Sequence, residues 1–341
     1  MRIGLALPHY DSSLAGAPAG WESVLDVAAT AEEAGFHSVW VSDHFFLDWG
    51  KYGGPDDLQG SLECWTTLAA LAAATKKVRL GSLVSGNDFR NPGLLAKMVA
   101  TLDVLSGGRA AVGLGAGWYE REYRAAGLAF DGARERIERL GEAVEIVRRL
   151  LAGEILDFKG AHYEMEGAIC RPVPRQDPPP PVFIGGKGDR LIDTVARCAD
   201  GWNFSWIGDI ASYEERLTAA HAACERVGRD PASLRLSVGV YLLAGKDGAD
   251  TRARFERYIE RTPVGVLQGS SGSAAVSWEE FAGSRVAGTV AEVTEKLGRL
   301  AELGVQEAIL TLGVLPFQLV DLEDVELVGS EIVPALGATE A

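Results

Sequence analysis

The sequence is poor in cysteine and contains no long hydrophobic run. Only four of its 341 residues are cysteines. They stand at positions 64, 170, 198 and 224, without C-x-x-C spacing and without a cluster of histidines, so neither a zinc site nor a redox motif is indicated. The longest apolar stretch, Leu68 to Ala74, is far shorter than the roughly 20 residues that span a bilayer. We therefore expect no metal centre and no transmembrane segment.

Basic residues are also scarce. The chain has 33 Lys and Arg against 48 Asp and Glu, a formal net charge of −15. Duplex nucleic acid and anionic membranes both require a basic face, so neither is expected as a partner. A small anionic cofactor is still compatible with this charge, because only the field at its own site matters. The apolar run in the N-terminal segment MRIGLALPHY is too short for a signal peptide, and we expect a first strand there and a cytoplasmic protein.

What the sequence does contain is a regular alternation of strand and helix patterns in a chain that is 47% apolar. The predicted strands are Ile3–Leu7, Ser38–Val41, Val78–Val84, Ala110–Leu114, Val182–Gly185, Trp202–Phe204, Leu234–Val240 and Ala308–Leu312. The predicted helices are Ser23–Ala34, Leu62–Ala74, Pro92–Leu105, Arg134–Leu151, Arg190–Ala199, Tyr213–Val227 and Val290–Leu303. This alternation predicts the α/β class and, with right-handed crossovers, a (β/α)8 TIM barrel that forms a single domain over residues 1–341.

Two insertions interrupt the pattern. Residues 154–181 combine a hairpin pattern at Leu156–Met165, turning at Lys159-Gly160, with the proline-rich stretch Arg171–Pro181, which must be extended. Residues 265–288 are rich in Gly, Ser and Ala, which predicts a mobile loop or lid.

Two glycine-rich stretches follow predicted strands. Gly113-Leu-Gly115-Ala-Gly117 is followed by Trp, so the G-x-G-x-x-G fingerprint of a Rossmann nicotinamide site is not met. We expect these glycines to let the backbone approach a ligand closely. The second stretch, Gly185-Gly186-Lys187-Gly188-Asp189-Arg190, opens a predicted helix and contains two cations. It is either a phosphate cradle made of free backbone N–H groups or a plain tight turn, and its place at the C-terminal end of a barrel strand favours the cradle.

One of the five histidines lies where a barrel carries its chemistry. Ser42-Asp43-His44 ends the second predicted strand. Because an imidazole titrates near neutrality and suits proton transfer, His44 is a candidate catalytic residue, and a structural histidine is the alternative. His9, just after the first strand, is a weaker candidate of the same kind. The remaining three histidines are assigned no chemistry.

Several tryptophans are found near predicted strand ends or in the loops that follow them. They are Trp49, Trp65, Trp118, Trp202 and Trp206. Each of them could pack in the core, but several at one mouth of a barrel would form a flat apolar pocket for a planar ring. The acidic residues Glu120 and Glu122 are interpreted as the solvated start of a helix rather than as an acid pair.

Several segments together resemble the luciferase-like monooxygenase superfamily. They are GFHSVWVSDHF at 35–45, VRLGSLV at 78–84, FRNPGLLAKMVATLDVLSGGRAAVGLGAGWYEREY at 89–123, PPPVFIGGKGDRLIDTVARCADGWNFSW at 179–206 and GTVAEVTEKLGRLAELGV at 288–305. The branch that they resemble most uses coenzyme F420, a deazaflavin. The resemblance implies a (β/α)8 barrel, usually a homodimer, that holds a flavin or deazaflavin at its C-terminal mouth.

The resemblance also implies roles for particular residues. The Asp-His pair of the family matches Asp43 and His44, which would flank the ring of the cofactor. The bulge of its third strand matches Leu83-Val84, where the family often has a non-proline cis peptide behind the ring. The next wall of the site matches Ala116 and Gly117, and the phosphate-binding turn matches Gly185, Gly186 and Gly188, with Lys187 between them. F420-dependent sugar-phosphate dehydrogenases carry a catalytic Glu where this chain has Trp118 and Tyr119, which argues against that substrate. Their active-site Trp matches Trp49 only with a shift of one residue.

These observations predict an F420-dependent oxidoreductase in which a hydride passes between the deazaflavin and a small organic substrate while His44 supplies or relays the proton. Either direction of transfer is allowed. One alternative is a two-component monooxygenase that uses O2 and FMNH2 from a separate reductase, and another is a non-catalytic flavin-binding barrel with an occluded pocket. The polyglutamate tail of F420 would require basic residues at the mouth, for which the candidates are Arg90, Lys97, Arg121, Arg124 and Lys187.

Overall fold

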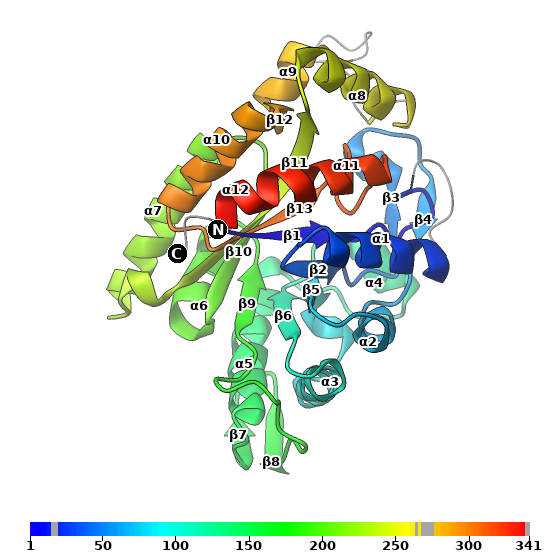
Figure 1. Cartoon of the computed structure of the whole chain (residues 1–341). Helices are drawn as coiled ribbons and strands as arrows, with labels where there is room; N and C mark the ends of the chain where they lie inside the picture. The colour runs from blue at the N-terminus through cyan, green and yellow to red at the C-terminus, as the bar shows by residue number, and fades with distance from the viewer. Residues whose placement is uncertain (15–19, 263–264, 267–275, 338–341) are drawn as a thin grey trace.

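The computed structural model describes residues 1–14, 20–262, 265–266 and 276–337. Eight parallel strands form a closed ring at its centre (Figure 1). In ring order they are β1 (Arg2–Ala6), β2 (Ser38–Val41), β5 (Arg79–Gly86), β6 (Ala110–Gly115), β9 (Val182–Gly185), β10 (Gly201–Ile207), β11 (Arg235–Gly245) and β13 (Glu307–Thr311). The ring closes because β13 pairs with both β11 and β1. The eight predicted strands and the barrel are confirmed.

The helices form a layer outside the ring. Those that follow successive strands are α1 (Trp21–Glu33), α2 (Cys64–Ala74), α3 (Pro92–Ser106), α5 (Ala133–Leu151), α6 (Asp189–Cys198), α7 (Ile210–Arg226) and α10 (Val290–Glu302). After β13 come α11 (Leu322–Leu327) and α12 (Val333–Gly337), joined by one wide turn over Val328–Ile332. All seven predicted helices are confirmed, and their ends differ from the predicted ones by at most three residues, the largest difference being the start of α7.

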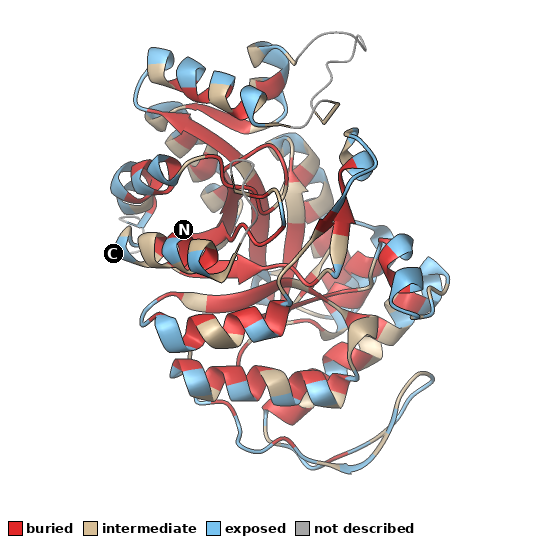
Figure 2. Cartoon of the chain, turned by 90° about the vertical axis from the view of Figure 1, so that its right-hand side faces the viewer, coloured by how far each residue is buried: buried red, intermediate tan, exposed pale blue. Residues whose placement is uncertain are grey.

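The helices pack on the ring through apolar stripes. In α5, buried Leu140, Val144, Val147 and Leu151 recur at helical spacing, so one face meets the strands and the charged face meets solvent. Figure 2 shows the same division throughout, with buried residues on the strands and on the inner helix faces. The resulting core fixes the strand ends, and with them the site.

Shorter elements are inserted after the strands. An antiparallel pair, β3 (Phe46–Asp48) and β4 (Leu58–Gly60), follows β2 and encloses the 3₁₀ turn Trp49–Tyr52. Further short helical segments are Asn87–Phe89, α4 (Glu120–Ala125) and Pro231–Ser233. The predicted hairpin is present as β7 (Leu156–Lys159) and β8 (Glu164–Ala168). Its turn lies over residues 160–163, because Gly160 N–H donates to the carbonyl of Tyr163, and not at Lys159-Gly160 as predicted.

The segment after β11 is more ordered than its composition suggests. It contains α8 (Gly248–Glu260), α9 (Trp278–Gly283) and β12 (Val286–Thr289), which pairs with the second half of β11. The prediction of a mobile loop over 265–288 is therefore wrong for 278–288, while residues 267–275 lie outside the described residues. The sequence reason is local: Ser277 and Glu280 form a capping box at the start of α9, and Phe281 is the buried residue of this helix. Among the described residues, no helix has the length and apolarity to cross a membrane.

Candidate active site

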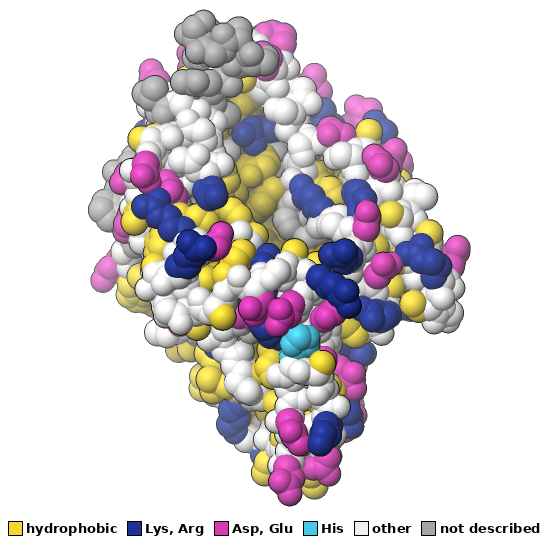
Figure 3. All heavy atoms as spheres, turned by 180° about the vertical axis from the view of Figure 1, so that it is seen from behind, with side chains coloured by type: hydrophobic (Ala, Val, Ile, Leu, Met, Phe, Trp, Pro, Cys, Tyr) yellow, Lys and Arg dark blue, Asp and Glu magenta, His cyan; other side chains and the backbone are white. Residues whose placement is uncertain are grey.

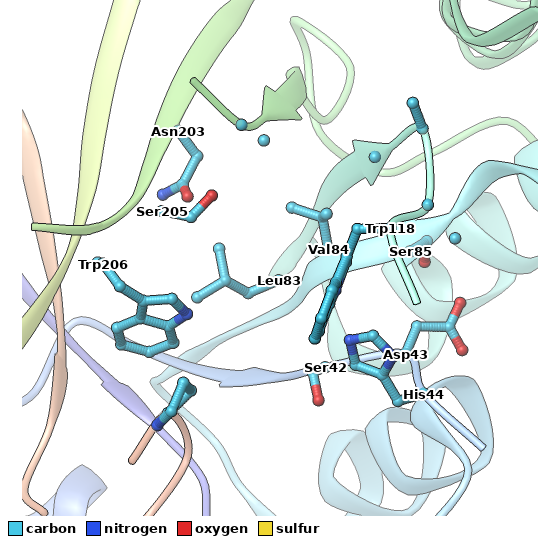
Figure 4. A pocket seen from close by; sticks show the side chains of 18 of the residues that line it. Ser42, Asp43, His44, Leu83, Val84, Ser85, Trp118, Asn203, Ser205 and Trp206 are labelled. Carbon is cyan, nitrogen blue, oxygen red and sulfur yellow. The ribbon is translucent and has the colours of Figure 1, made fainter. Parts of the chain in front are cut away.

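A cavity of about 460 Å³ opens at the C-terminal ends of the barrel strands, within the usual size range of small-molecule sites. All of the residues predicted for the site line it: His44, Asp43, Leu83, Val84, Ala116, Gly117, Gly185, Gly186, Lys187 and Gly188. They come from different strand ends (Figure 4). The structure thus brings the predicted residues together, and their roles remain predictions.

The floor of the cavity is built around Val84. The Leu83-Val84 peptide is cis, as the resemblance implied, and the pairing of β5 with β6 shifts register between Ser82 and Ser85. A Cβ added at Gly113, Gly115 or Gly185 would come within 2.7, 2.7 and 2.8 Å of the Val84 side chain. The glycines therefore make room for Val84 itself, whereas the sequence suggested that they admit a ligand. Val84 fills this space and presents an apolar surface to the cavity.

His44 is held by a carboxylate that the sequence analysis misassigned. Its Nδ1 lies 2.7 Å from Oε1 of Glu122, and the backbone N–H of Phe45 donates to the other oxygen at 3.1 Å. Glu122 is only 1% exposed, so its interpretation as a solvated residue is wrong; Glu120 is indeed exposed and pairs with Arg124. Because a carboxylate can only accept, Nδ1 carries the proton and a neutral His44 has a bare Nε2. His44 is 17% exposed at the cavity.

Asp43 faces a different partner. Arg90 donates to both of its carboxylate oxygens, at 2.5 and 3.1 Å, and also to Glu63. The carboxylate points away from Leu83 and Val84 (Figure 4). Burial raises the pKa of Asp43, although Arg90 acts in the opposite direction. Asp43 thus anchors the strand end, and only part of it reaches the cavity wall.

The glycine turn before α6 has the features of a phosphate site. Gly188 is the N-cap of α6 and supplies no side-chain cap, so the first N–H groups of the helix need other partners. Lys187 Nζ lies 4.4 Å from the centre of the Phe204 ring and donates to the carbonyl of Trp206. Burial lowers the pKa of this lysine. The uncapped N-terminus of α6 is the feature that an anion would use, and the choice between a phosphate cradle and a plain tight turn remains a prediction.

Two further residues that sequence reasoning missed line the same cavity. Asn203 is 2% exposed, and its Oδ1 has no hydrogen-bond partner among the described residues. A buried amide oxygen without a partner is costly, which indicates a donor on a ligand. Arg136 lines the opposite wall and donates to the carbonyls of Ala116 and Asp131. Asn203 lies within the segment 179–206 that carries the resemblance but was given no role there, and Arg136 lies outside all of the segments quoted for it.

The tryptophans divide between the cavity and the core. Trp118 and Trp206 line the cavity, and Trp118, 52% exposed, meets His44 edge-on at 5.8 Å. Trp49, Trp65 and Trp202 are not among the described residues that line the cavity. Trp65 donates to Ser85 and Trp202 to the carbonyl of Gly186, so they support the walls from behind, and Trp49 is buried under α8 and α9. The predicted aromatic pocket exists, with two of the five tryptophans.

The basic residues that the F420 tail would require do not gather at the mouth of the described cavity. Of these five residues, only Lys187 belongs to the described cavity lining. Arg90 is bound by Asp43 and Glu63, Arg121 by Asp48 and Asp56, and Arg124 by Glu120, while Lys97 donates to the carbonyl of Arg171. Arg90 and Arg121 are engaged by carboxylates far away in the sequence, Arg124 by a carboxylate one helical turn away and Lys97 by a backbone carbonyl. On the rear face of the molecule, Lys and Arg alternate with Asp and Glu around an apolar hollow (Figure 3).

A parallel barrel with an apolar cavity at its C-terminal mouth and a carboxylate-held histidine beside it is the arrangement of a barrel enzyme. Within the described part of the chain, no group of three or more His, Cys, Asp or Glu could hold a metal ion. The model of the luciferase-like monooxygenase family matches residues 1–307. The chain therefore belongs to the luciferase-like monooxygenase family.

Individual relatives give more detail than the family model, because their names state a cofactor. The chain is 34% identical to an F420-dependent hydroxymycolic acid dehydrogenase of Mycobacterium tuberculosis, over 66% of this chain and 60% of the relative. It is 36% identical to an F420-dependent glucose-6-phosphate dehydrogenase of Amycolatopsis mediterranei, over 59% of this chain and 58% of the relative. The match thus spans less than two thirds of the length of either relative. Among solved structures, a monooxygenase from Streptomyces bottropensis superposes with a TM-score of 0.76 at 24% identity over 100% of both chains, a likeness of fold.

Proposed function

We propose that this chain is an F420-dependent oxidoreductase that acts on a small uncharged organic molecule. The observation that carries the proposal is His44, held at Nδ1 by buried Glu122 and placed in one cavity with Val84 and the Gly185–Gly188 turn. F420-dependent relatives at 34% and 36% identity support the choice of cofactor. Such a deazaflavin supplies a site that takes up or releases a hydride.

The residues present fit the ring and the phosphate of this cofactor, whereas of the basic residues named for its polyglutamate tail only Lys187 lies in the described cavity lining. Val84 offers a flat apolar surface for a ring, and the turn at Gly185–Gly188 offers backbone N–H groups and Lys187 for a phosphate. The unpaired Oδ1 of Asn203 can accept a hydrogen bond from a hydroxyl group. The chain's own contribution is to hold the ring, exclude water and place the acid or base, since the cofactor carries the redox chemistry.

His44 acts as the proton carrier in this proposal. With Nδ1–H committed to Glu122, a neutral ring can accept a proton only at Nε2. The hydrogen bond to Glu122 also fixes the orientation of the ring, so that Nε2 is the nitrogen available to the ligand. The same group can return the proton when the reaction runs in reverse.

The substrate side of the cavity supports an uncharged molecule. The cationic side chains of the described lining are Lys187 and Arg136. Lys187 is assigned above to the phosphate of the cofactor, and Arg136 already donates to the backbone carbonyls of Ala116 and Asp131. A sugar phosphate would thus lack a free cation there, and the chain has Trp118 and Tyr119 where the resemblance places the catalytic Glu of sugar-phosphate dehydrogenases. A homodimer, a cytoplasmic location and a reductase partner remain part of the proposal.

His44→Ala tests the proposal in an anaerobic assay that follows the visible absorbance of F420 with a panel of secondary alcohols. We expect turnover to fall at least tenfold while the affinity for F420 stays within a factor of two. His221→Ala, on α7 outside the cavity, is the matched control. Turnover that is unchanged in His44→Ala would remove His44 from the mechanism, and tight FMN binding with oxygen uptake would favour the monooxygenase alternative. The open cavity with His44 at its wall does not favour the non-catalytic alternative.

A further inference from the structure

A second cavity, of about 400 Å³, lies at the end of the barrel opposite to the candidate active site. Its wall contains Arg2, Arg79, Arg235 and Glu307, which are the first residues of β1, β5, β11 and β13. Because these strands are parallel, their first residues gather at the N-terminal end of the ring. The two cavities have no described lining residue in common, so the proposed reaction does not use the second one.

Space for this cavity exists because two aromatic rings lie over glycines of neighbouring strands. Trp40 pairs across the sheet with Gly81, and Phe183 pairs with Gly201. A Cβ added at either glycine would collide with the aromatic ring opposite to it, so each ring lies over the adjacent strand and leaves the end of the barrel open. Both rings belong to the cavity wall. The cavity therefore has an aromatic surface beside its charged residues.

The three arginine side chains keep most of their N–H donors unused. Among the described residues, the exposed side chains of Arg2 and Arg235 have no hydrogen bond and no ion pair. Arg79 is half-buried, and its Nη2 donates to the Ala110 carbonyl and to Gln176 Oε1, both at 2.8 Å. Its Nε and Nη1 have no partner in the part of the chain that the structure describes. Three guanidinium groups at one cavity can therefore donate to a ligand.

The two carboxylates of the described lining, Glu307 and Asp177, do not take up these donors. Glu307 Oε1 accepts from Ser38 Oγ in a short contact and from Trp40 Nε1 at 3.2 Å. Asp177 is exposed on the proline-rich segment and has no ion pair within the described ranges. The arginines are thus left without a directly paired counter-charge from the described residues.

The like charges at this end of the barrel repel one another. Burial lowers the pKa of Arg79, and the charges of Arg2 and Arg235 act in the same direction. Glu307 and Asp103 act against them. Three arginines against two carboxylates leave the described lining positive, although the whole chain has a formal net charge of −15. An anion bound among the guanidinium groups would relieve this repulsion.

We propose that this cavity is a second binding site, which holds a small organic anion through Arg2, Arg79 and Arg235. A guanidinium group presents paired N–H donors that match the oxygen atoms of a phosphate or a carboxylate group. Three such groups at one opening suit a ligand with at least two negative charges. The wall formed by Trp40 and Phe183 accommodates an apolar part of the ligand. The inference does not depend on the proposed function, because the site lies at the other end of the barrel.

Isothermal titration calorimetry of the full chain at low ionic strength tests the proposal, with pyrophosphate and citrate as probes. We expect at least one probe to bind with a dissociation constant below about 1 mM, and the tighter one shows whether phosphate or carboxylate groups are preferred. Arg2→Gln/Arg235→Gln removes two exposed cations that have no described partner, so binding should weaken at least tenfold. Arg252→Gln/Arg299→Gln removes the same charge from the surface of α8 and α10 and should leave the affinity within twofold.

A further variant separates this site from the glycine turn before α6, where an anion is also predicted. Binding of the probe should persist in Lys187→Met, because Lys187 lines only the candidate active site. Binding that is lost in Lys187→Met and retained in Arg2→Gln/Arg235→Gln would place the anion at the turn and overturn the proposal. The absence of saturable binding of both probes to the parent chain would overturn it as well.

Discussion

The contact between Glu122 and His44 leads to a quantitative prediction. In Glu122→Gln the shape is kept, but the amide cannot accept from both His44 Nδ1 at 2.7 Å and Phe45 N–H at 3.1 Å. One charge-assisted hydrogen bond is lost, which is about 1.5–3 kcal/mol and corresponds to about 10- to 100-fold in rate. We expect kcat to fall by that factor with little change in KM.

A direct view of the imidazole gives a readout that does not depend on activity. Proton–nitrogen NMR of labelled protein, with His44 assigned through a His44→Gln variant, should show the Nδ1–H form with a bare Nε2 in the parent. In Glu122→Gln that preference should weaken, because the side chain keeps only one acceptor oxygen for the two N–H groups that Glu122 now binds.

Glu120→Gln is the matched control, because Glu120 lies on the same short helix and pairs only at the surface with Arg124. A surface pair contributes about 0–1 kcal/mol, so this variant should behave like the parent. The reasoning is refuted if Glu122→Gln keeps kcat within twofold and leaves the tautomer unchanged.

Three further predictions concern packing and pH. Gly113→Ala places a Cβ 2.7 Å from the Val84 side chain and 2.8 Å from a backbone carbonyl, so we expect the affinity for F420 to fall at least tenfold. Gly298→Ala, in open space within α10, is the control and should raise the free energy of unfolding by about 0.5–1 kcal/mol. Equal effects of the two variants on F420 binding and on the melting temperature would contradict the packing argument. Because the pKa of His9 is lowered to about 4 by burial, the folded state resists its protonation, and stability should fall by up to about 3 kcal/mol as pH drops from 6.5 to 4. This loss should be absent in His9→Gln, and denaturant unfolding that shows the same pH slope in both proteins would refute it. Burial raises the pKa of Asp324 to about 6, so the stability that its protonated form contributes is fully present below about pH 4 and is lost as pH rises through 6. Relative to Asp324→Asn, the free energy of unfolding of the parent should fall by about 2–3 kcal/mol over that range. A difference between the two proteins that stays constant with pH would contradict the cost of burying this charge.

The ring and its helices could be predicted because each strand and each amphipathic helix is a local pattern. The site residues Asp43, His44 and Leu83-Val84 could be located from the same patterns with the family resemblance, because strand ends in a barrel converge on one mouth. The cis peptide at Leu83-Val84 followed from the resemblance alone. The Gly-, Ser- and Ala-rich composition of residues 265–288 led to a wrong prediction where a short capping motif at Ser277 starts the helix α9.

What could not be predicted depends on contacts between distant segments. The local sequence around Glu122 predicts a solvated residue. In the structure Glu122 is buried, because the strand end at His44, 78 residues away in the sequence, packs against α4. Arg90 is kept from the mouth of the cavity for the same reason, since it pairs with Asp43, which lies 47 residues away in the sequence. The hydrogen bonds that join Tyr10, Ser42 and His9 link two strand ends, and nothing in either segment alone shows them.

The central claim is that the cavity accepts F420, and a pair of fluorescence titrations tests it most directly. The purified full chain is titrated with F420 and, separately, with FMN. The proposal predicts saturable binding of F420 at micromolar or tighter affinity and much weaker binding of FMN. Tight binding of FMN without a response to F420 would contradict it.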